Sequence, residues 1–375
     1  MEAPKTAPPQ PKKAPAATPP TQSQPGGPPT DLGPGYVVER QIGTGSFATV
    51  WLATKDQTPV AVKAVDRSRL TKKLRANLDD EIKILGSVKH PNLVAFVDAV
   101  PRPERIYVVL EFLAGGDLQK FIRSKGRLQE STAQKWIGHL ASGLECLWSR
   151  SLVHRDLKPN NVMIGPFGEV LVVDWGLCKV LGEHEESVQS SGSVDVDDSL
   201  RTQDGMVAGT PAYMAPEQAK GENESLCEQT DIYSLGAVLY TLLTEKAPFF
   251  GKVDTVLEKV IQGDFDPPRT RVSSAVPKEL DAIVCRAMAT SMDDRYGSVR
   301  ALSEDVQAFM ESRPVSVVQY NPLQRAMKWA VRNQKVVRPV GLTSALGIVA
   351  LISGGLLHIN QMEQVMENAV AEAHR

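Results

Sequence analysis

Eight consecutive residues near the middle of the chain carry side chains suited to one kind of chemistry. They are His154-Arg155-Asp156-Leu157-Lys158-Pro159-Asn160-Asn161, and Asp174-Trp175-Gly176 follows shortly afterwards. Asp156 can accept or orient the proton of a hydroxyl group, and Lys158 can offset negative charge on a transferring group. Asn161 and Asp174 offer hard oxygen ligands of the kind that Mg²⁺ prefers. The set predicts transfer of a phosphoryl group from a magnesium-bound nucleotide to a hydroxyl.

Two further segments could hold that nucleotide. In Ile42-Gly43-Thr44-Gly45-Ser46-Phe47-Ala48-Thr49-Val50 the glycines let the backbone turn and bring its N–H groups toward phosphate oxygens, although a plain hairpin turn would look similar. In Val60-Ala61-Val62-Lys63 a single lysine stands in an apolar strand, where burial is costly unless the charge is paired. Glu81 on the next predicted helix is the natural partner, which would let Lys63 hold the α- and β-phosphates. An ordinary surface salt bridge is the alternative for this pair.

The elements that must position these residues change character along the chain. Residues 36–65, 94–98 and 106–110 read as strands, since apolar residues alternate there or run together. Helical periodicity is predicted for 70–87, 131–150, 231–244, 253–262, 280–289 and 299–309. A small β-rich lobe followed by a larger helical lobe is an α+β fold with a cleft between the lobes.

A further motif follows the others in the chain, Gly209-Thr210-Pro211-Ala212-Tyr213-Met214-Ala215-Pro216-Glu217. Taken together and in this order, the motifs resemble those of the eukaryotic-type (Hanks-type) protein serine/threonine kinases over residues 36–312. The resemblance implies a two-lobed kinase fold that uses ATP and Mg²⁺. It assigns catalytic roles to Asp156, Lys158, Lys63 and Glu81, and magnesium binding to Asn161 and Asp174. The ATP-binding set that it implies is Ile42, Gly43, Thr44, Gly45, Ser46, Val50, Ala61, Lys63, Glu111, Leu113, Asp117 and Met163.

Structural roles also follow from the resemblance. It implies that Glu217 pairs with Arg295, that Asp231 braces the catalytic loop, and that Thr210 positions the substrate. Lys158 together with Thr210 resembles the serine/threonine branch rather than the tyrosine kinases. Two positions depart from the usual pattern: Ala48 replaces a third glycine and Trp175 replaces a phenylalanine.

Three other functions would use parts of the same sequence. A pseudokinase that binds ATP without turnover would lack Lys63, Asp156, Asn161 or Asp174, and all four are present. A membrane scaffold would use the Pro-rich N-terminal tail to recruit partners. A small-molecule kinase would not need the peptide-seating segment that ends at Glu217.

The segment between Asp174 and Glu217 is long, and its middle is rich in serine and acidic residues. Arg155 beside Asp156 usually accompanies control by phosphorylation in the resembled family, because an arginine pocket needs an anion to order the loop. Thr202 is the first candidate phosphosite, followed by Ser199 and Ser193. A solvated insert without a switch is the alternative.

Composition and charge predict the state of the N-terminal region, the class of partner and the cellular compartment. Residues 1–35 are dominated by Pro, Ala, Gln and Thr, which predicts a disordered tail or, alternatively, a Pro-rich ligand. The net charge of −2 does not favour nucleic acid as a partner. The four cysteines are widely spaced, which suits a reducing cytosol better than a disulfide framework.

Near the C-terminus, residues 339–357 contain no charged side chain and are mostly aliphatic or small. About 20 such residues are needed for a helix to cross a bilayer. Basic residues precede the run, so we expect one transmembrane helix at 339–359 with the kinase domain in the cytosol, at the cytoplasmic (inner) membrane. A buried helix of a soluble domain is the alternative. This organisation resembles bacterial membrane-anchored serine/threonine kinases.

The segments on either side of this run complete the predicted organisation. Residues 313–338 form a basic juxtamembrane segment whose part 322–335 has one apolar helical stripe, typical of a helix at the membrane surface or of a stalk packed on the kinase domain. Residues 360–375 are a short outer helical stub. Its heptad-like spacing, with small residues in the predicted span, suggests a homodimer. The protein substrate cannot be predicted from the sequence.

Overall fold

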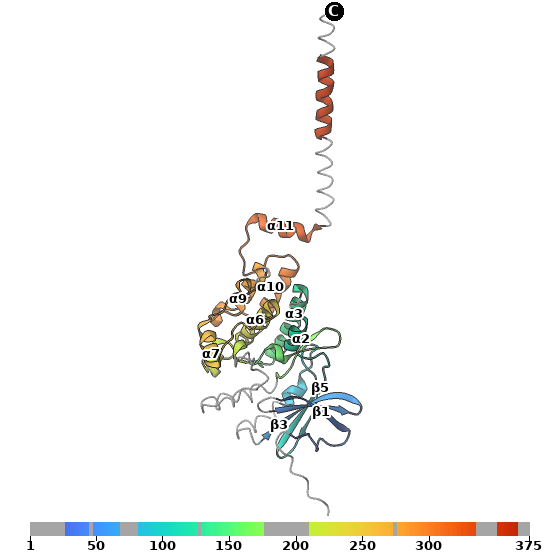
Figure 1. The fold of residues 1–375 in the computed structure, drawn as a ribbon, viewed down its shortest axis with the longest axis vertical. Helices are drawn as coiled ribbons and strands as arrows, with labels where there is room; N and C mark the ends of the chain where they lie inside the picture. Colours follow the sequence, from blue (N-terminus) through green and yellow to red (C-terminus); the bar gives the residue numbers. More distant parts are fainter. Residues whose placement is uncertain are drawn as a thin grey trace, which may run out of the picture. The chain divides into compact units, whose positions relative to one another are not determined.

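The computed structural model describes residues 27–44, 48–67, 82–126, 129–175, 210–272, 276–334 and 351–366. The chain divides into two compact units, Met1–Ser87 with Ala95–Phe112, and Val88–Val94 with Leu113–Arg375. The first contains a β-sheet and the second is mainly helical (Figure 1). This division confirms the predicted two-lobed α+β fold. Each unit is described by itself.

The first unit is built on a five-stranded antiparallel sheet with the order β1-β2-β3-β5-β4. Its strands are β1 (Tyr36–Thr44), β2 (Ala48–Lys55), β3 (Thr58–Asp66), β4 (Phe96–Pro101) and β5 (Arg105–Glu111). These strands confirm the three predicted β regions. Of the predicted helix 70–87, the structure describes residues 82–87, which are helical.

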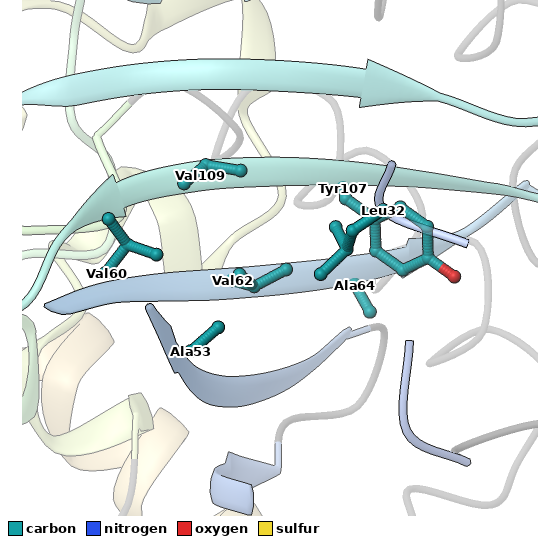
Figure 2. Close-up of a cluster of buried hydrophobic side chains, with 7 residues drawn as sticks. All are labelled: Leu32, Ala53, Val60, Val62, Ala64, Tyr107 and Val109. Carbon is teal, nitrogen blue, oxygen red and sulfur yellow. The ribbon is translucent and has the colours of Figure 1, made fainter. Parts of the chain in front are cut away.

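The two faces of this sheet differ because side chains alternate along a strand. On one face Val60, Val62 and Ala64 of β3 are buried. Figure 2 shows them in a cluster with Leu32, Ala53, Tyr107 and Val109. Ala61 and Lys63, which alternate with these residues, belong to the opposite face. The apolar cluster therefore fixes the register that places Lys63 away from it.

The segment 27–35 contacts the sheet through Leu32 and Asp31, although composition assigned it to a disordered tail. The side chain of Leu32 is only 5% exposed. The Tyr107 hydroxyl donates to Asp31 Oδ1 at 2.7 Å, and Arg102 Nε donates to the Asp31 carbonyl at 2.7 Å. Burial and the Asp31 carboxylate raise the pKa of Tyr107 to about 12. One leucine and one aspartate thus order a segment whose average composition predicted disorder.

The second unit is organised around α6, which is buried on all sides from Thr230 to Thr244. Its elements are α2 (Leu118–Lys125), α3 (Glu130–Trp148), η2 (Pro159–Asn161), β6 (Val162–Ile164), β7 (Val170–Val172), η4 (Thr210–Tyr213), α5 (Pro216–Ala219), η5 (Asn223–Ser225), α6 (Glu228–Thr244), α7 (Val253–Gln262), α8 (Pro268–Arg271), α9 (Lys278–Ala287), η6 (Met292–Asp294), α10 (Val299–Met310) and α11 (Pro322–Arg332). A helix without a polar face belongs in a core. The five helices predicted between 131 and 309 are confirmed.

The α6 helix approaches α9 closely at Gly236. A Cβ atom at this position would lie 2.7 Å from the Cβ of Ala287. The absence of a side chain is therefore what lets the two helices pack at this distance. This contact positions the N-terminal end of α6, which carries Asp231.

Residues 313–320 pack on α9 and α10 rather than leaving the domain. Val315 is 3% exposed, and Asp305 on α10 accepts from Ser316 N and Ser316 Oγ, both at 2.7 Å. The Tyr296 hydroxyl donates to the same carboxylate at 2.9 Å. The Tyr320 hydroxyl lies 3.3 Å from Glu279 Oε1. We call residues 313–320 the C-terminal docking segment.

The α11 helix follows directly, and Asn321 caps it by accepting from Gln324 N at 2.8 Å. Its bounds, Pro322–Arg332, lie within the segment 322–335 for which the sequence predicts an amphipathic helix. Lys328 forms an ion pair with Glu279 at 3.2 Å, whereas Leu323 and Met327 are exposed. Among the described residues, which omit 335–350, no helix has the length and apolar character needed to cross a bilayer.

Candidate active site

In the first unit, one row across three strands unites several predicted nucleotide-binding residues. Gly43 on β1 pairs with Val50 on β2, and Val50 pairs with Lys63 on β3. Two residues before Lys63, Ala61 pairs with Leu110 of β5. Lys63 is 8% exposed, so nearly all of its side chain is buried. This row provides an apolar surface with one cation, as a purine and its phosphates require.

The structure describes fewer contacts for the other predicted nucleotide-binding residues of this unit. Ile42 and Thr44 lie at the end of β1, where the Thr44 hydroxyl accepts a hydrogen bond from Gln41 Nε2. Glu111 ends β5, and its N–H donates to the Ala95 carbonyl at 2.9 Å. The predicted residues Gly45, Ser46 and Glu81 lie outside the described residues, so the expected pair of Glu81 with Lys63 stays a prediction.

In the second unit, Asp117 and Met163 are neighbours because their backbones form an isolated antiparallel bridge. Asp117 caps α2: its Oδ1 accepts from Lys120 N at 2.8 Å, and its Oδ2 lies 2.9 Å from Lys120 Nζ. Leu113 precedes them and is 8% exposed. The structure thus brings Asp117 and Met163 together, and the expected contact of Asp117 with a ribose stays a prediction.

Asp231 holds the predicted catalytic loop, residues 154–161, from the core, as the resemblance implied. Its Oδ2 accepts from His154 N at 2.8 Å and from Trp148 Nε1 at 2.9 Å. Its Oδ1 accepts from Arg155 N at 2.9 Å. Complete burial raises the pKa of Asp231, and the three donated hydrogen bonds offset part of this rise. A fully buried carboxylate with three donors is a rigid anchor for the loop.

His154 positions Asp156 through its imidazole ring. Its Nδ1 accepts from Asp156 N at 3.2 Å, so the ring proton is on Nε2, which donates to the Val173 carbonyl at 3.0 Å. The side chain is fully buried. The ring therefore connects the backbone of Asp156 to the strand that leads to Asp174.

Three predicted catalytic and metal-binding residues meet at the Asp156 carboxylate. Lys158 Nζ lies 2.8 Å from Asp156 Oδ2, and Asn161 Nδ2 donates to the same oxygen at 2.9 Å. Asn161 Nδ2 also donates to the Asp156 carbonyl at 2.8 Å. A carboxylate has about four acceptor sites, so Asp156 keeps capacity for a substrate hydroxyl.

The same contacts test whether the residues suit Mg²⁺. Since both bonds of Asn161 use its nitrogen, its Oδ1 is the atom left to coordinate a cation. Val173 N donates to the Asn161 carbonyl at 3.0 Å, so Asp174 follows directly on a residue bonded to Asn161. Asp174 has φ of 62°, a left-handed conformation uncommon for aspartate. Asn161 Oδ1 and the Asp174 carboxylate would supply two oxygen ligands, which suits Mg²⁺ because this cation also takes water and phosphate oxygens as ligands. The described residues contain no cluster of three or more His, Cys, Asp or Glu that could hold a metal.

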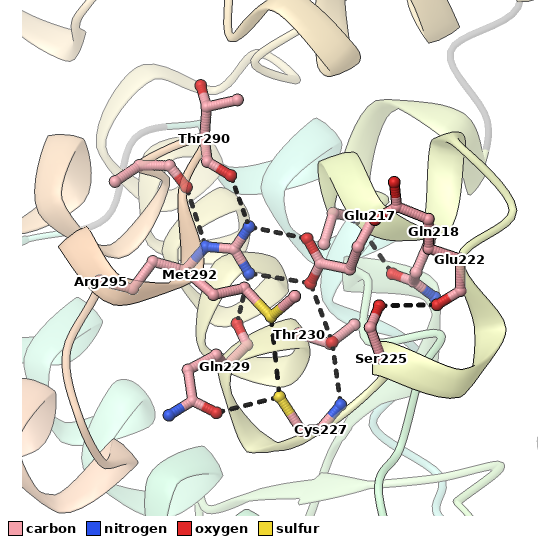
Figure 3. Close-up of polar contacts among 12 residues, drawn as sticks. Glu217, Gln218, Glu222, Ser225, Cys227, Gln229, Thr230, Thr290, Met292 and Arg295 are labelled. Carbon is pink, nitrogen blue, oxygen red and sulfur yellow. Dashed lines mark hydrogen bonds and ion pairs between the residues drawn. The ribbon is translucent and has the colours of Figure 1, made fainter.

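Glu217 and Arg295 form the predicted ion pair in the core of the second unit (Figure 3). Arg295 Nη1 and Nη2 donate to the two carboxylate oxygens at 2.9 and 2.8 Å, and the side chains of Arg295 and Glu217 are 0% and 3% exposed. Thr230 Oγ1 donates to the same carboxylate at 2.9 Å. Burial alone raises the pKa of Glu217, but Arg295 and Thr230 reverse this effect and lower it below the usual value.

The structure describes the remaining predicted site residues only in part. Trp175 is 4% exposed, and among the described residues its Nε1 has no hydrogen-bond partner. The backbone of Thr210 begins η4. The phosphosite candidates Thr202, Ser199 and Ser193 lie outside the described residues.

The sequence motifs did not identify Trp148 as a residue that supports the site. Its indole N–H binds Asp231 from 83 positions away, at the end of α3. The only sequence signal was its place on the core face of the predicted helix, which does not specify a polar contact.

Comparison with known proteins agrees with this geometry. The protein kinase domain family matches residues 36–312. The serine/threonine-protein kinase ATG1c of Arabidopsis thaliana is 35% identical over 221 residues, which are 58% of this chain and 28% of that protein. The serine/threonine-protein kinase PknD of Protochlamydia amoebophila is 31% identical over 300 residues, or 74% of this chain and 30% of the relative. Myosin light chain kinase A of Dictyostelium discoideum is 29% identical over 274 residues, or 72% of this chain and 86% of the relative. This chain spans less than a third of the length of the first two relatives. Because the family match covers most of its residues, the chain belongs to the protein kinase domain family.

Proposed function

We propose that this chain is an ATP-dependent protein serine/threonine kinase. The observation that carries the proposal is the convergence of Lys158 and Asn161 on the Asp156 carboxylate, in a loop that Asp231 anchors. A pseudokinase would not need this arrangement, and no observation favours one. The relatives named serine/threonine-protein kinases support the choice of hydroxyl acceptor.

In the proposed reaction the oxygen of a serine or threonine hydroxyl bonds to the γ-phosphorus of ATP. The bond from that phosphorus to the bridging oxygen breaks, ADP leaves, and the hydroxyl proton passes to Asp156. Lys158 offsets negative charge on the transferring group, and Lys63 holds the α- and β-phosphates. Asn161 Oδ1 and Asp174 would hold Mg²⁺, which when bound neutralises phosphate charge.

The test is a kinase assay on the purified chain with ATP, Mg²⁺ and a mixed serine/threonine peptide library. The Asp156→Asn variant is the control because it keeps the size and most hydrogen bonds of the side chain. We expect wild-type turnover to exceed that of the variant by a factor on the order of 100 or more, since a positioned base contributes about 10²–10⁴-fold. Equal turnover of the two proteins would contradict the proposal.

We also propose that residues 339–359 cross the inner membrane once and that the kinase domain lies in the cytosol. Support comes from the uncharged run 339–357, the basic residues before it, and the exposed apolar side chains of α11, Leu323, Met327 and Val331. These side chains would lie in the membrane surface. The full chain should stay with membranes during alkaline carbonate washing, whereas a chain without 339–359 should be released. Release of the full chain would contradict the anchor.

Regulation is proposed for the segment between Asp174 and Glu217. Thr202, Ser199 and Ser193 are the sites where an added phosphate would find Arg155 as a cationic partner. Mass spectrometry of wild-type protein and the Asp156→Asn variant after incubation with ATP tests this, since only the wild type should carry phosphate there. Crosslinking in membranes tests the proposed homodimer, which a purely monomeric pattern would contradict.

A further inference from the structure

The backbone turn at Arg155 and Asp156 makes more hydrogen bonds than the sequence motifs predict. Arg155 has φ of 67°, a left-handed conformation that a side chain with a Cβ rarely adopts unless its surroundings fix it. Asp231 accepts from the Arg155 N–H, and His154 accepts from the Asp156 N–H. The Arg155 carbonyl is the remaining polar group of this turn.

That carbonyl accepts a hydrogen bond from Gln218 Nε2 at 2.6 Å. The other end of the same amide, Oε1, accepts from Ala215 N at 3.1 Å. These two contacts determine the amide orientation, because the reversed amide would set oxygen against oxygen and nitrogen against N–H. Gln218 therefore bridges the catalytic loop and the segment that ends at Glu217.

The backbone that carries Gln218 is itself fixed. Its neighbour Glu217 is 3% exposed and pairs with Arg295, and Pro216 begins the short helix α5. Gln218 is half-buried, so it is neither in the core nor freely solvated. A glutamine on a rigid backbone, with both ends of its amide bonded, transmits position between the two segments that it joins.

We propose that Gln218 is a positioning residue for phosphoryl transfer, which orients Asp156 by holding the Arg155 carbonyl and sets it relative to the peptide-seating segment. The inference rests on the proposed kinase activity. It requires a donor at the Nε2 position. Glutamate, which has the same shape, places an oxygen against the carbonyl, and leucine removes both bonds.

The test compares the full chain with Gln218→Glu and Gln218→Leu in steady-state assays with ATP and the peptide library. Gln307→Leu is the matched control, because Gln307 is exposed on α10 and its side chain bonds only to Glu311 among the described residues. We expect kcat to fall on the order of 10-fold in both Gln218 variants, as displaced catalytic groups lose rate steeply. KM for ATP and the melting temperature should stay close to the wild-type values.

A second readout separates positioning from general destabilisation. The carboxyl group introduced by Gln218→Glu would, once protonated, again donate to the Arg155 carbonyl. The apposed Arg155 carbonyl oxygen favours the protonated form and raises the pKa of that carboxyl, whereas the Ala215 N–H donates to its other oxygen and offsets part of this rise. The kcat of Gln218→Glu relative to wild type should therefore rise as pH falls from about 8 toward about 5.5.

Gln218→Leu should show no such rise, because leucine has no proton to gain. Unchanged kcat in both variants, or a matched loss of ATP binding and melting temperature, would overturn the inference. A wild-type chain without turnover would instead contradict the kinase activity on which it rests.

Discussion

Replacing Arg295 with methionine should destabilise the second unit far more than the loss of one ordinary ion pair. Arg295 uses its Nε, Nη1 and Nη2 groups to bind Glu217 and the carbonyls of Gln229, Ala289 and Thr290. Methionine fills much of the volume but leaves the Glu217 carboxylate charged and buried. Removing one partner of a buried pair costs about 3–5 kcal/mol, and we expect Arg295→Met to fall in this range.

The assay is urea unfolding of the purified chain, followed by circular dichroism. The exposed pair of Arg300 with Glu145 offers a control, since Arg300→Met should cost no more than about 1 kcal/mol. The double variant Glu217→Met/Arg295→Met should be more stable than Arg295→Met alone, because it no longer buries a lone charge. A loss for Arg295→Met no larger than that of the control would refute this reasoning.

The pH dependence of the same variant checks the cause. In the wild type the folded-state pKa of Glu217 is lowered, so its contribution to stability is complete above its unfolded value and disappears as pH falls through the folded value. Without Arg295, burial should raise that pKa instead. The destabilisation by Arg295→Met should then be smaller at about pH 5 than at about pH 7, and an equal loss at both values would show that a buried charge is not its cause.

Three further outcomes are expected. Gly236→Val should cost about 1–3 kcal/mol of unfolding free energy, because its side chain meets Ala287; a loss within about 0.5 kcal/mol would show that α6 and α9 can separate freely. Trp148→Phe should cost about 1–3 kcal/mol and lower kcat, since Asp231 loses one of three donors; unchanged stability and kcat would mean that two donors suffice. Leu32→Ala should cost about 2–5 kcal/mol in the first unit, and unchanged thermal unfolding would contradict the packing of residues 27–35.

The sequence predicted the parts of the site that lie close together in the chain. Asp156, Lys158 and Asn161 occupy one short loop, so their types and spacing already determine which side chains can meet. The distant pair Glu217 and Arg295 followed from family resemblance, because nothing in local spacing joins two segments 78 positions apart.

Contacts that depend on packing were not predictable in this way. Leu32 is a single apolar residue in a Pro- and Gly-rich stretch, and only the assembled sheet offers it a surface to cover. Gln218 follows the last motif residue, and its proposed role depends on its hydrogen bond to the carbonyl of Arg155, a residue with an unusual backbone conformation. In both places tertiary geometry decides the contact, and periodicity carries no information about it.

The C-terminal docking segment has a practical consequence for dissecting this protein. A fragment that stops at residue 312, where the family match ends, would remove Val315 and both Ser316 donors while leaving the Asp305 carboxylate behind. It would also remove Tyr320, whose hydroxyl reaches Glu279 and whose ring lies against the Lys328 ammonium group. The boundary drawn by similarity and the boundary drawn by folding therefore differ, and a fragment intended for biophysical work should extend through α11.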